Sequence, residues 1–187
     1  MYQAKAVTLE PGMIPAAVAI VLREGDEGPE ALFIHRAERA GDTWSGQIAF
    51  PGGRREPSDS HLRATAVRET REEVGVDLTG AERLGVLDDM YPRTPVLPPV
   101  MVRPFVFGVV DRPPLTLNEE VQDAFWVSFG ALNAPGVQRD VTIRRRDLER
   151  VFPAYVLENH TIWGMTERIL TNLISLAKST SSLDNIK

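Results

Sequence analysis

Three glutamates crowd one short stretch, RETREEVGV, as Glu69, Glu72 and Glu73. At roughly 100° per residue on a helix, Glu69 and Glu73 lie about 40° apart, and Glu72 about 60° from Glu69 on the other side. The three carboxylates therefore share one face. Hard divalent cations such as Mg²⁺ and Mn²⁺ prefer oxygen ligands of this kind. A solvated acidic face is the alternative, although neighbouring like charges repel by roughly 0.2–0.5 kcal/mol per pair.

A glycine turn precedes these glutamates in QIAFPGGR, residues 47–54. Gly52 and Gly53 permit unusual backbone angles and the close approach of another group. Alone, a Pro-Gly-Gly sequence indicates only a tight turn. Its place ahead of the glutamate helix suggests that the two segments act together.

Two helices and six strands are expected to position these residues. The first helix should start at the N-cap types of residues 58–60 and stop before Gly75. The second should cover about 161–177, where apolar residues recur at spacings of three and four. Strands are predicted at 14–22, 31–36, 47–50, 83–91, 101–110 and 123–129. The first two should form a hairpin. Pro104 indicates an edge or a bulge in the strand 101–110. The pattern predicts one α/β domain over 1–187, with a core at about 13–177 and a disordered tail at 178–187.

Composition excludes several functions. The net charge of −5 argues against binding of a nucleic-acid polymer, which needs a basic face. The absence of cysteine excludes disulfides, zinc–thiolate sites and thiol nucleophiles. No signal-peptide pattern opens the chain, and no apolar run reaches the roughly 18 residues of a membrane span, so we expect a cytoplasmic protein without membrane partners. The three histidines have no metal-ligand spacing, so structural or surface roles are expected for them.

The combined motif resembles the box of the Nudix hydrolases, G-x5-E-x7-R-E-U-x-E-E-x-G-U, where U is aliphatic. The matching residues are Gly53, Arg68-Glu69, Glu72-Glu73, Gly75 and Val76. The Gly53–Arg68 spacing is one residue longer than in the box. Asp59 or Ser60 stands at the early acidic position, and Thr70 at an aliphatic one. The resemblance implies an α/β/α sandwich with a central mixed sheet.

The longer spacing looks like that of the subgroup that contains coenzyme A pyrophosphatases. Further similarity lies at Gly46-Gln47 and in residues 103–106, 118–121 and 162–166, whereas Trp44 stands where the subgroup usually has histidine. The resemblance implies cleavage of coenzyme A or its derivatives to 3′,5′-ADP and 4′-phosphopantetheine. Trp44 keeps other substrates open, namely a nucleotide sugar, a dinucleoside polyphosphate or an oxidised nucleotide. A non-catalytic ligand-binding domain is the alternative of another class.

The resemblance also implies roles for the box residues. Glu69 and Glu73 would bind Mg²⁺ or Mn²⁺, with Glu72 as a further ligand directly or through water. The carbonyl of Gly53 would support the metal. Arg68 would orient the carboxylates as a residue of the catalytic machinery.

Residues outside the glutamate helix complete the expected site. Glu120 is the candidate general base, with a plain loop charge as the alternative. The substrate-binding candidates are Arg36, Gly52, Gly53, Arg144 and Arg145. The run 144–146 would grip an extra phosphate, although a solvated run is the simpler explanation. Trp126 and Trp163 are expected in the core or a pocket wall, with adenine stacking as the alternative. The partner is a small-molecule diphosphate, and a homodimer is compatible with the sequence.

Overall fold

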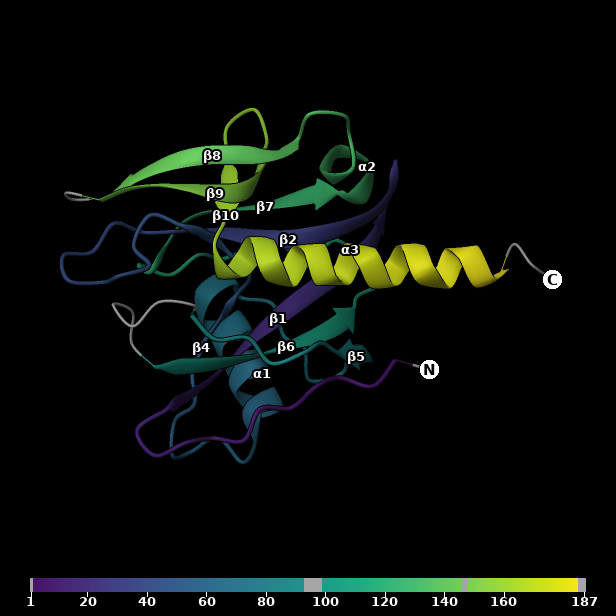
Figure 1. Cartoon of the computed structure of the whole chain (residues 1–187). Helices are drawn as coiled ribbons and strands as arrows, with labels where there is room; N and C mark the ends of the chain where they lie inside the picture. Colours follow the sequence, from purple (N-terminus) through teal and green to yellow (C-terminus); the bar gives the residue numbers. More distant parts are fainter. Residues whose placement is uncertain (1, 93–98, 146–147, 185–187) are drawn as a thin grey trace.

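The computed structural model describes residues 2–92, 99–145 and 148–184, without the side chains of residues 145, 148 and 180–184. A seven-stranded sheet has the order β3-β2-β1-β6-β5, with β4 paired to β1 and β7 to β2; β10-β9-β8 form a second sheet (Figure 1). The strands are β1 (Ile14–Gly25), β2 (Gly28–Arg36), β3 (Ile48–Ala49), β4 (Gly52–Arg54), β5 (Glu82–Val86), β6 (Val100–Gly108), β7 (Val121–Ser128), β8 (Gln138–Arg145), β9 (Leu148–Val156) and β10 (Thr161–Trp163). The helices are α1 (Leu62–Val74), α2 (Phe129–Leu132) and α3 (Met165–Asp184).

Strand β1 carries a core on each of its faces. Successive side chains of a strand point to opposite sides. Ala17 and Val21 accordingly join a cluster that includes Ala66 of α1. Ala16 and Ile20 join a second cluster, which includes Ile169, Leu170, Leu173 and Ile174 of α3. β1 pairs with β6 in parallel and with β2 antiparallel, so the sheet is mixed and lies between helices, as the sequence predicted.

The predicted hairpin and the first helix are confirmed, with one change at the helix start. β1 and β2 pair antiparallel up to Gly25 and Gly28. Gly75 ends α1 in the left-handed region at φ 75°. The N-cap is His61, not a residue of 58–60, because Asp59 already accepts hydrogen bonds from the Glu56 N–H and from an arginine.

The second helix differs at both ends. Thr161–Trp163 form β10, which pairs with β9, and Gly164 at φ 72° separates this strand from α3. Ile162 therefore packs from a strand, not from the helix. At the other end α3 continues to Asp184 and does not stop near 177, so residues 178–184 are helical where a disordered tail was expected.

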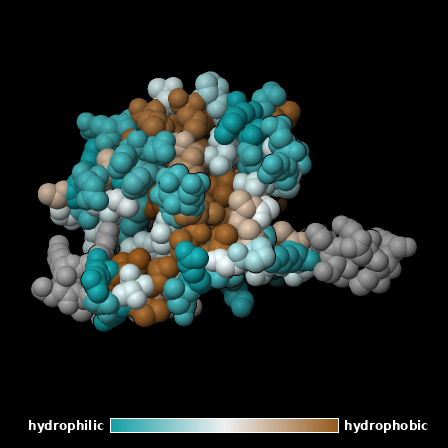
Figure 2. Space-filling model, turned by 90° about the horizontal axis from the view of Figure 1, so that it is seen from above, coloured by the Kyte–Doolittle hydropathy of each residue, from teal (hydrophilic) through white to brown (hydrophobic). Residues whose placement is uncertain are grey.

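The remaining differences lie in the strands. β5 ends at Val86, before the predicted 91. The expected edge at Pro104 is wrong, because β6 lies between β1 and β5: Pro104 pairs with Val18 of β1, and its carbonyl accepts a hydrogen bond from the Leu87 N–H at 3.0 Å. The register of β5 against β6 shifts between Arg83 and Gly85. The β8–β9 hairpin was not predicted, since charged and apolar residues do not alternate cleanly there. From above, the face that includes this hairpin mixes hydrophilic and apolar surface (Figure 2). None of the helices within the described residues is both long and apolar enough to cross a membrane.

Candidate active site

Helix α1 and strand β4 face each other and hold the two predicted metal glutamates between them. A Cβ on Gly53 would collide with the carboxylate of Glu69, so glycine is needed for this approach. Gly52, at φ 153°, has no room for a Cβ either, because Ala17 and Val18 of β1 lie against it. The two glycines therefore let β4 lie close to both β1 and α1.

Glu73 is a buried carboxylate with 1% of its surface exposed. It accepts a hydrogen bond of 2.8 Å from the backbone N–H of Gly52 and lies 3.5 Å from the Arg36 guanidinium. Burial raises the pKa of Glu73 to about 8. Burial also raises the pKa of Glu69. Two neighbouring carboxylates with poor hydration are stabilised in their charged form by a cation.

The donor set fits a hard divalent ion. Among the described residues no three His, Asp or Glu side chains converge into a ready metal cluster. Glu69 and Glu73 nevertheless both line one cavity next to Gly53. Mg²⁺ is commonly held by one or two carboxylates, with water and substrate phosphates completing its octahedron. These residues can therefore hold Mg²⁺ or Mn²⁺ when substrate is present.

Arg68 connects the glutamate helix to the loop before it. Asp59 is 5% exposed, and its two carboxylate oxygens each accept a 3.0 Å hydrogen bond from Arg68. This contact lowers the pKa of Asp59 to about 2. Arg68 also pairs with Glu69 at 3.0 Å and donates to the carbonyl of Arg54 at 3.1 Å. Asp59, not Ser60, thus fills the acidic position of the box, and Arg68 can orient Glu69 as predicted.

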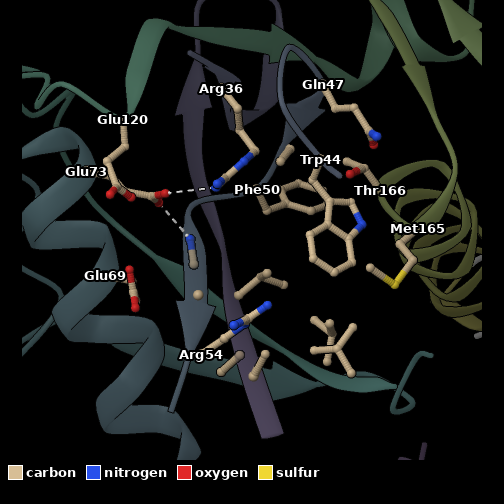
Figure 3. A pocket seen from close by; sticks show the side chains of 18 of the residues that line it. Arg36, Trp44, Gln47, Phe50, Arg54, Glu69, Glu73, Glu120, Met165 and Thr166 are labelled. Carbon is tan, nitrogen blue, oxygen red and sulfur yellow. Dashed lines mark hydrogen bonds and ion pairs between the residues drawn. The ribbon is translucent and has the colours of Figure 1, made fainter. Parts of the chain in front are cut away.

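Glu72 and Glu120 stand in different relations to the cavity. The side chain of Glu72 is 52% exposed, pairs with Arg68 at 2.9 Å and is not among the cavity residues. Glu120 lines the cavity from the loop before β7, where it pairs with Arg39 at 2.8 Å. Figure 3 shows Glu120 on the same side of the cavity as Glu69 and Glu73. The geometry thus brings together Glu69, Glu73 and Glu120 but leaves Glu72 outside.

Two arginines reach the cavity, and only one of them was predicted. Arg36 ends β2 and pairs with Asp42 at 3.2 Å as well as with Glu73. Arg54, which follows Gly53 directly, lines the cavity and was missed, although its adjacency to the glycine pair was a usable signal. Both lie between the glutamates and Trp44 in Figure 3.

The predicted basic run lies elsewhere. Arg144 is in β8, with 79% of its side chain exposed, and it pairs with Glu149 of β9 at 2.9 Å. It is not among the cavity residues. The side chain of Arg145 and all of Arg146 lie outside what the structure describes. The structure therefore does not bring Arg144 to the glutamates.

The histidines and two tryptophans take structural positions. His61 caps α1 through Nδ1, and His160 stacks on Phe125 with ring centroids 3.8 Å apart. Trp126 lies under Arg23, and Trp163 contacts Phe152. None of these side chains is among the cavity residues, which include Trp44 instead.

The cavity has a volume of about 400 Å³ and a second, largely apolar side. Its members come from the segments on either side of β3, from β1 and β6 and from α3: Ala16, Trp44, Gln47, Phe50, Val100, Val102, Met165, Thr166 and Ile169. The sequence had singled out Trp44 as a residue that bears on the choice of substrate. The α3 residues were missed, because helical periodicity marked Met165 and Ile169 only as core.

Comparison with known proteins points to one family. The NUDIX domain family profile matches residues 13–147. An uncharacterized protein of Schizosaccharomyces pombe is 37% identical over 134 residues, covering 68% of this chain and 41% of the relative. The mitochondrial coenzyme A diphosphatase NUDT8 of Mus musculus is 30% identical over 148 residues, covering 78% of this chain and 69% of that protein. The uncharacterized Nudix hydrolase NudL of Shigella boydii is 33% identical, covering 69% and 66%.

Solved structures agree at the level of the fold. A MutT/nudix family protein from Enterococcus faecalis superposes with a TM-score of 0.58 at 20% identity, covering 88% of this chain and 61% of that one. At this identity the likeness shows the fold alone. Strands β9 and β10 and helix α3 lie beyond the family profile, yet α3 contributes to the cavity.

Proposed function

Because the chain belongs to the Nudix family, we propose that it hydrolyses the diphosphate bond of a nucleoside diphosphate linked to another moiety, with Mg²⁺ or Mn²⁺ as cofactor. Coenzyme A or a derivative is the leading substrate, which would give 3′,5′-ADP and 4′-phosphopantetheine. The observation that carries the proposal is the buried Glu73 and the partly buried Glu69, held against Gly52 and Gly53 at the end of a cavity.

Glu69 and Glu73 would hold the metal, supported by the carbonyl of Gly53. The bound ion supplies charge for the phosphoryl oxygens and lowers the pKa of water. Arg68 fixes the direction of Glu69 through its contacts with Asp59 and the Arg54 carbonyl. This arrangement keeps the carboxylates in place before the substrate arrives.

The cationic and basic groups have complementary tasks. Arg36 and Arg54 face the middle of the cavity, where guanidinium groups can bind phosphate oxygens. Glu120 lines the cavity and would take a proton from the attacking water. Water then adds to phosphorus, and the bond from phosphorus to the bridging oxygen breaks. Glu72 would contribute to metal binding through a water molecule, because its carboxylate lies outside the cavity.

Two considerations bear on the substrate. The similarity to proteins named mitochondrial coenzyme A diphosphatase, at 30% identity, supports coenzyme A. Trp44 at the cavity supports the second candidate, a diphosphate with a different second moiety such as a nucleotide sugar, a dinucleoside polyphosphate or an oxidised nucleotide.

A substrate panel tests the proposal directly. Purified protein is incubated with Mg²⁺ or Mn²⁺ and coenzyme A, acetyl-coenzyme A, ADP-ribose, a diadenosine polyphosphate or an oxidised nucleoside triphosphate, and products are identified by mass spectrometry. Metal-dependent release of 3′,5′-ADP and 4′-phosphopantetheine supports coenzyme A. Turnover of other members alone moves the assignment to the second candidate. No turnover with either metal refutes the diphosphatase and favours a ligand-binding domain.

A further inference from the structure

The cavity has two chemically different ends. Glu69 and Glu73 mark one end, and Trp44 with Met165 marks the other (Figure 3). Arg36 and Arg54 lie between the two ends. A diphosphate held at the arginines would therefore place one of its substituents beside Trp44. The chemistry of the Trp44 end then decides which substituent fits.

Trp44 is held in place by its own loop. Its backbone N–H donates to Asp42 Oδ1 at 2.9 Å, and its carbonyl accepts from the Gln47 N–H at 3.2 Å. The indole is half-buried against the core cluster. The backbone of Trp44 is thus held by its loop, and its indole packs on one side against the core. Stacking of a ligand on a side chain that is already packed costs less conformational freedom.

The surroundings of the indole are equally firm. Phe50 is 2% exposed and stacks on Phe33 with ring centroids 4.8 Å apart. In Figure 3 the polarizable thioether of Met165 lies on the side of the indole that is opposite Phe50. A rigid aromatic slot suits a flat ring better than a flexible chain, because only the ring matches it without losing many rotamers.

Two polar side chains lie at the rim of this slot. The Gln47 amide donates to the carbonyl of Thr43 at 3.5 Å, and Thr166 lies beside it in the first turn of α3. A primary amide offers a donor and an acceptor side by side, which matches the exocyclic amine and ring nitrogen of adenine. A hydroxyl can complete such a contact in either sense.

We infer that the Trp44 slot binds the adenine ring of the substrate, stacked on Trp44 and read by Gln47 and Thr166. This inference rests on the proposed function, since the position of the diphosphate defines which end the base occupies. It assigns specificity to α3, a segment beyond the family profile. The substrate class is accordingly an adenosine diphosphate derivative, with the second moiety directed toward solvent or the glutamate end.

Binding of product halves tests the slot without turnover. Affinities of AMP, ribose 5-phosphate and 4′-phosphopantetheine are measured by calorimetry with Mg²⁺ present, for the wild type and for Trp44→Phe, Trp44→Leu and Trp44→Ala. AMP should bind the wild type about 10-fold or more tightly than ribose 5-phosphate, because base–aromatic stacking adds affinity of that order. The Leu and Ala variants should lose this preference, and the Phe variant should keep most of it.

Gln47→Met gives the second measurement. It keeps the length of the side chain and removes the amide that would contact the exocyclic amine, which AMP has and IMP lacks. The ratio of the AMP affinity to the IMP affinity should therefore fall to about 3 or less. Trp163→Phe is the matched control, because Trp163 contacts Phe152 away from the cavity, and its AMP affinity should stay within about two-fold. Circular dichroism selects folded variants; Trp44→Leu and Gln47→Met keep the test decisive if Trp44→Ala does not fold.

Three outcomes overturn the inference. The first is equal affinity of the wild type for AMP and ribose 5-phosphate, and the second is an unchanged AMP preference in Trp44→Leu. The third is that the Trp44 variants lose binding of 4′-phosphopantetheine but keep binding of AMP. The last result would put the other end of coenzyme A in the slot. Failure of the proposed function looks different. In that case no diphosphate is cleaved, whereas the Trp44-dependent preference for AMP persists.

Discussion

The glutamate end and the Trp44 end of the cavity are built in opposite ways. The glutamate end is built mainly from one short stretch of chain, residues 52–73, with a strand and a helix packed through two glycines, and Glu120 joins it from the loop before β7. The Trp44 end combines residues 44–50, β6 and the start of α3. The first end holds charge in a fixed local frame, whereas the second is a tertiary assembly. Chemistry and substrate choice can therefore vary independently in this molecule.

Substitution of Glu73 should cause the largest loss of activity at either end of the cavity. Glu73→Gln keeps the shape but removes a ligand charge, so kcat/KM should fall about 100-fold or more. Calorimetric Mn²⁺ affinity should fall as well, whereas Trp44-dependent binding of AMP relative to ribose 5-phosphate should persist. Glu27→Gln in the β1–β2 turn is the matched control and should leave activity unchanged. Full activity of Glu73→Gln would remove the glutamate end from the reaction.

Glu72→Gln should have a smaller effect on activity than Glu73→Gln at the same end of the cavity. Its carboxylate is exposed and outside the cavity, so its loss should cost clearly less than the loss of Glu73. An equal cost would show that Glu72 turns inward when the metal binds.

Asp59 supplies the next largest effect, because it holds Arg68. Asp59→Asn should lower kcat/KM by about 10- to 100-fold through the misplaced carboxylates. It should also lower the free energy of unfolding at neutral pH by about 1–3 kcal/mol, since a buried charged hydrogen bond is weakened. Activity is measured with the favoured substrate, and stability by urea unfolding. An inactive variant with wild-type stability would separate the two roles.

The pH dependence of this contact has a definite sign. The pKa of Asp59 is lowered in the folded state to about 2, so its contribution is fully present above the unfolded value of 3.8. That contribution is lost as the pH falls from about 4 to about 2. The stability difference between wild type and Asp59→Asn should therefore shrink over this window. A constant difference would mean that Asp59 does not titrate with a lowered pKa.

The two ends also differ in how far the sequence predicted them. Glu69, Glu73 and Gly53 were predictable, because helical geometry and glycine chemistry are local. The first helix, its end at Gly75 and the β1–β2 hairpin were predictable for the same reason. Met165 and Thr166 were not, since only tertiary packing brings the start of α3 to Trp44. Glu72 shows the limit of the local argument, because a shared helical face still left its carboxylate outside the cavity.

A smaller effect is expected at the Trp44 end through Met165. Met165→Ala removes contact area from the slot but no charge, so KM for an adenosine-containing substrate should rise by about 3- to 10-fold while kcat changes little. This kinetic signature is opposite to that of Glu73→Gln. Steady-state kinetics on the active member of the substrate panel measure it. A loss confined to kcat would mean that α3 acts on the reacting atoms and that the two ends are not separable.

The smallest effect is expected at Arg144, which belongs to neither end. Its guanidinium is mostly exposed and pairs with Glu149, and an exposed pair contributes about 1 kcal/mol at most. Arg144→Ala should therefore change KM for coenzyme A and for dephospho-coenzyme A by less than about two-fold each. Arg54→Ala, which removes a cavity arginine, is the matched comparison and should raise KM for both. A rise for coenzyme A alone in Arg144→Ala would instead make the β8–β9 hairpin a third substrate-binding region, reading the 3′-phosphate that dephospho-coenzyme A lacks.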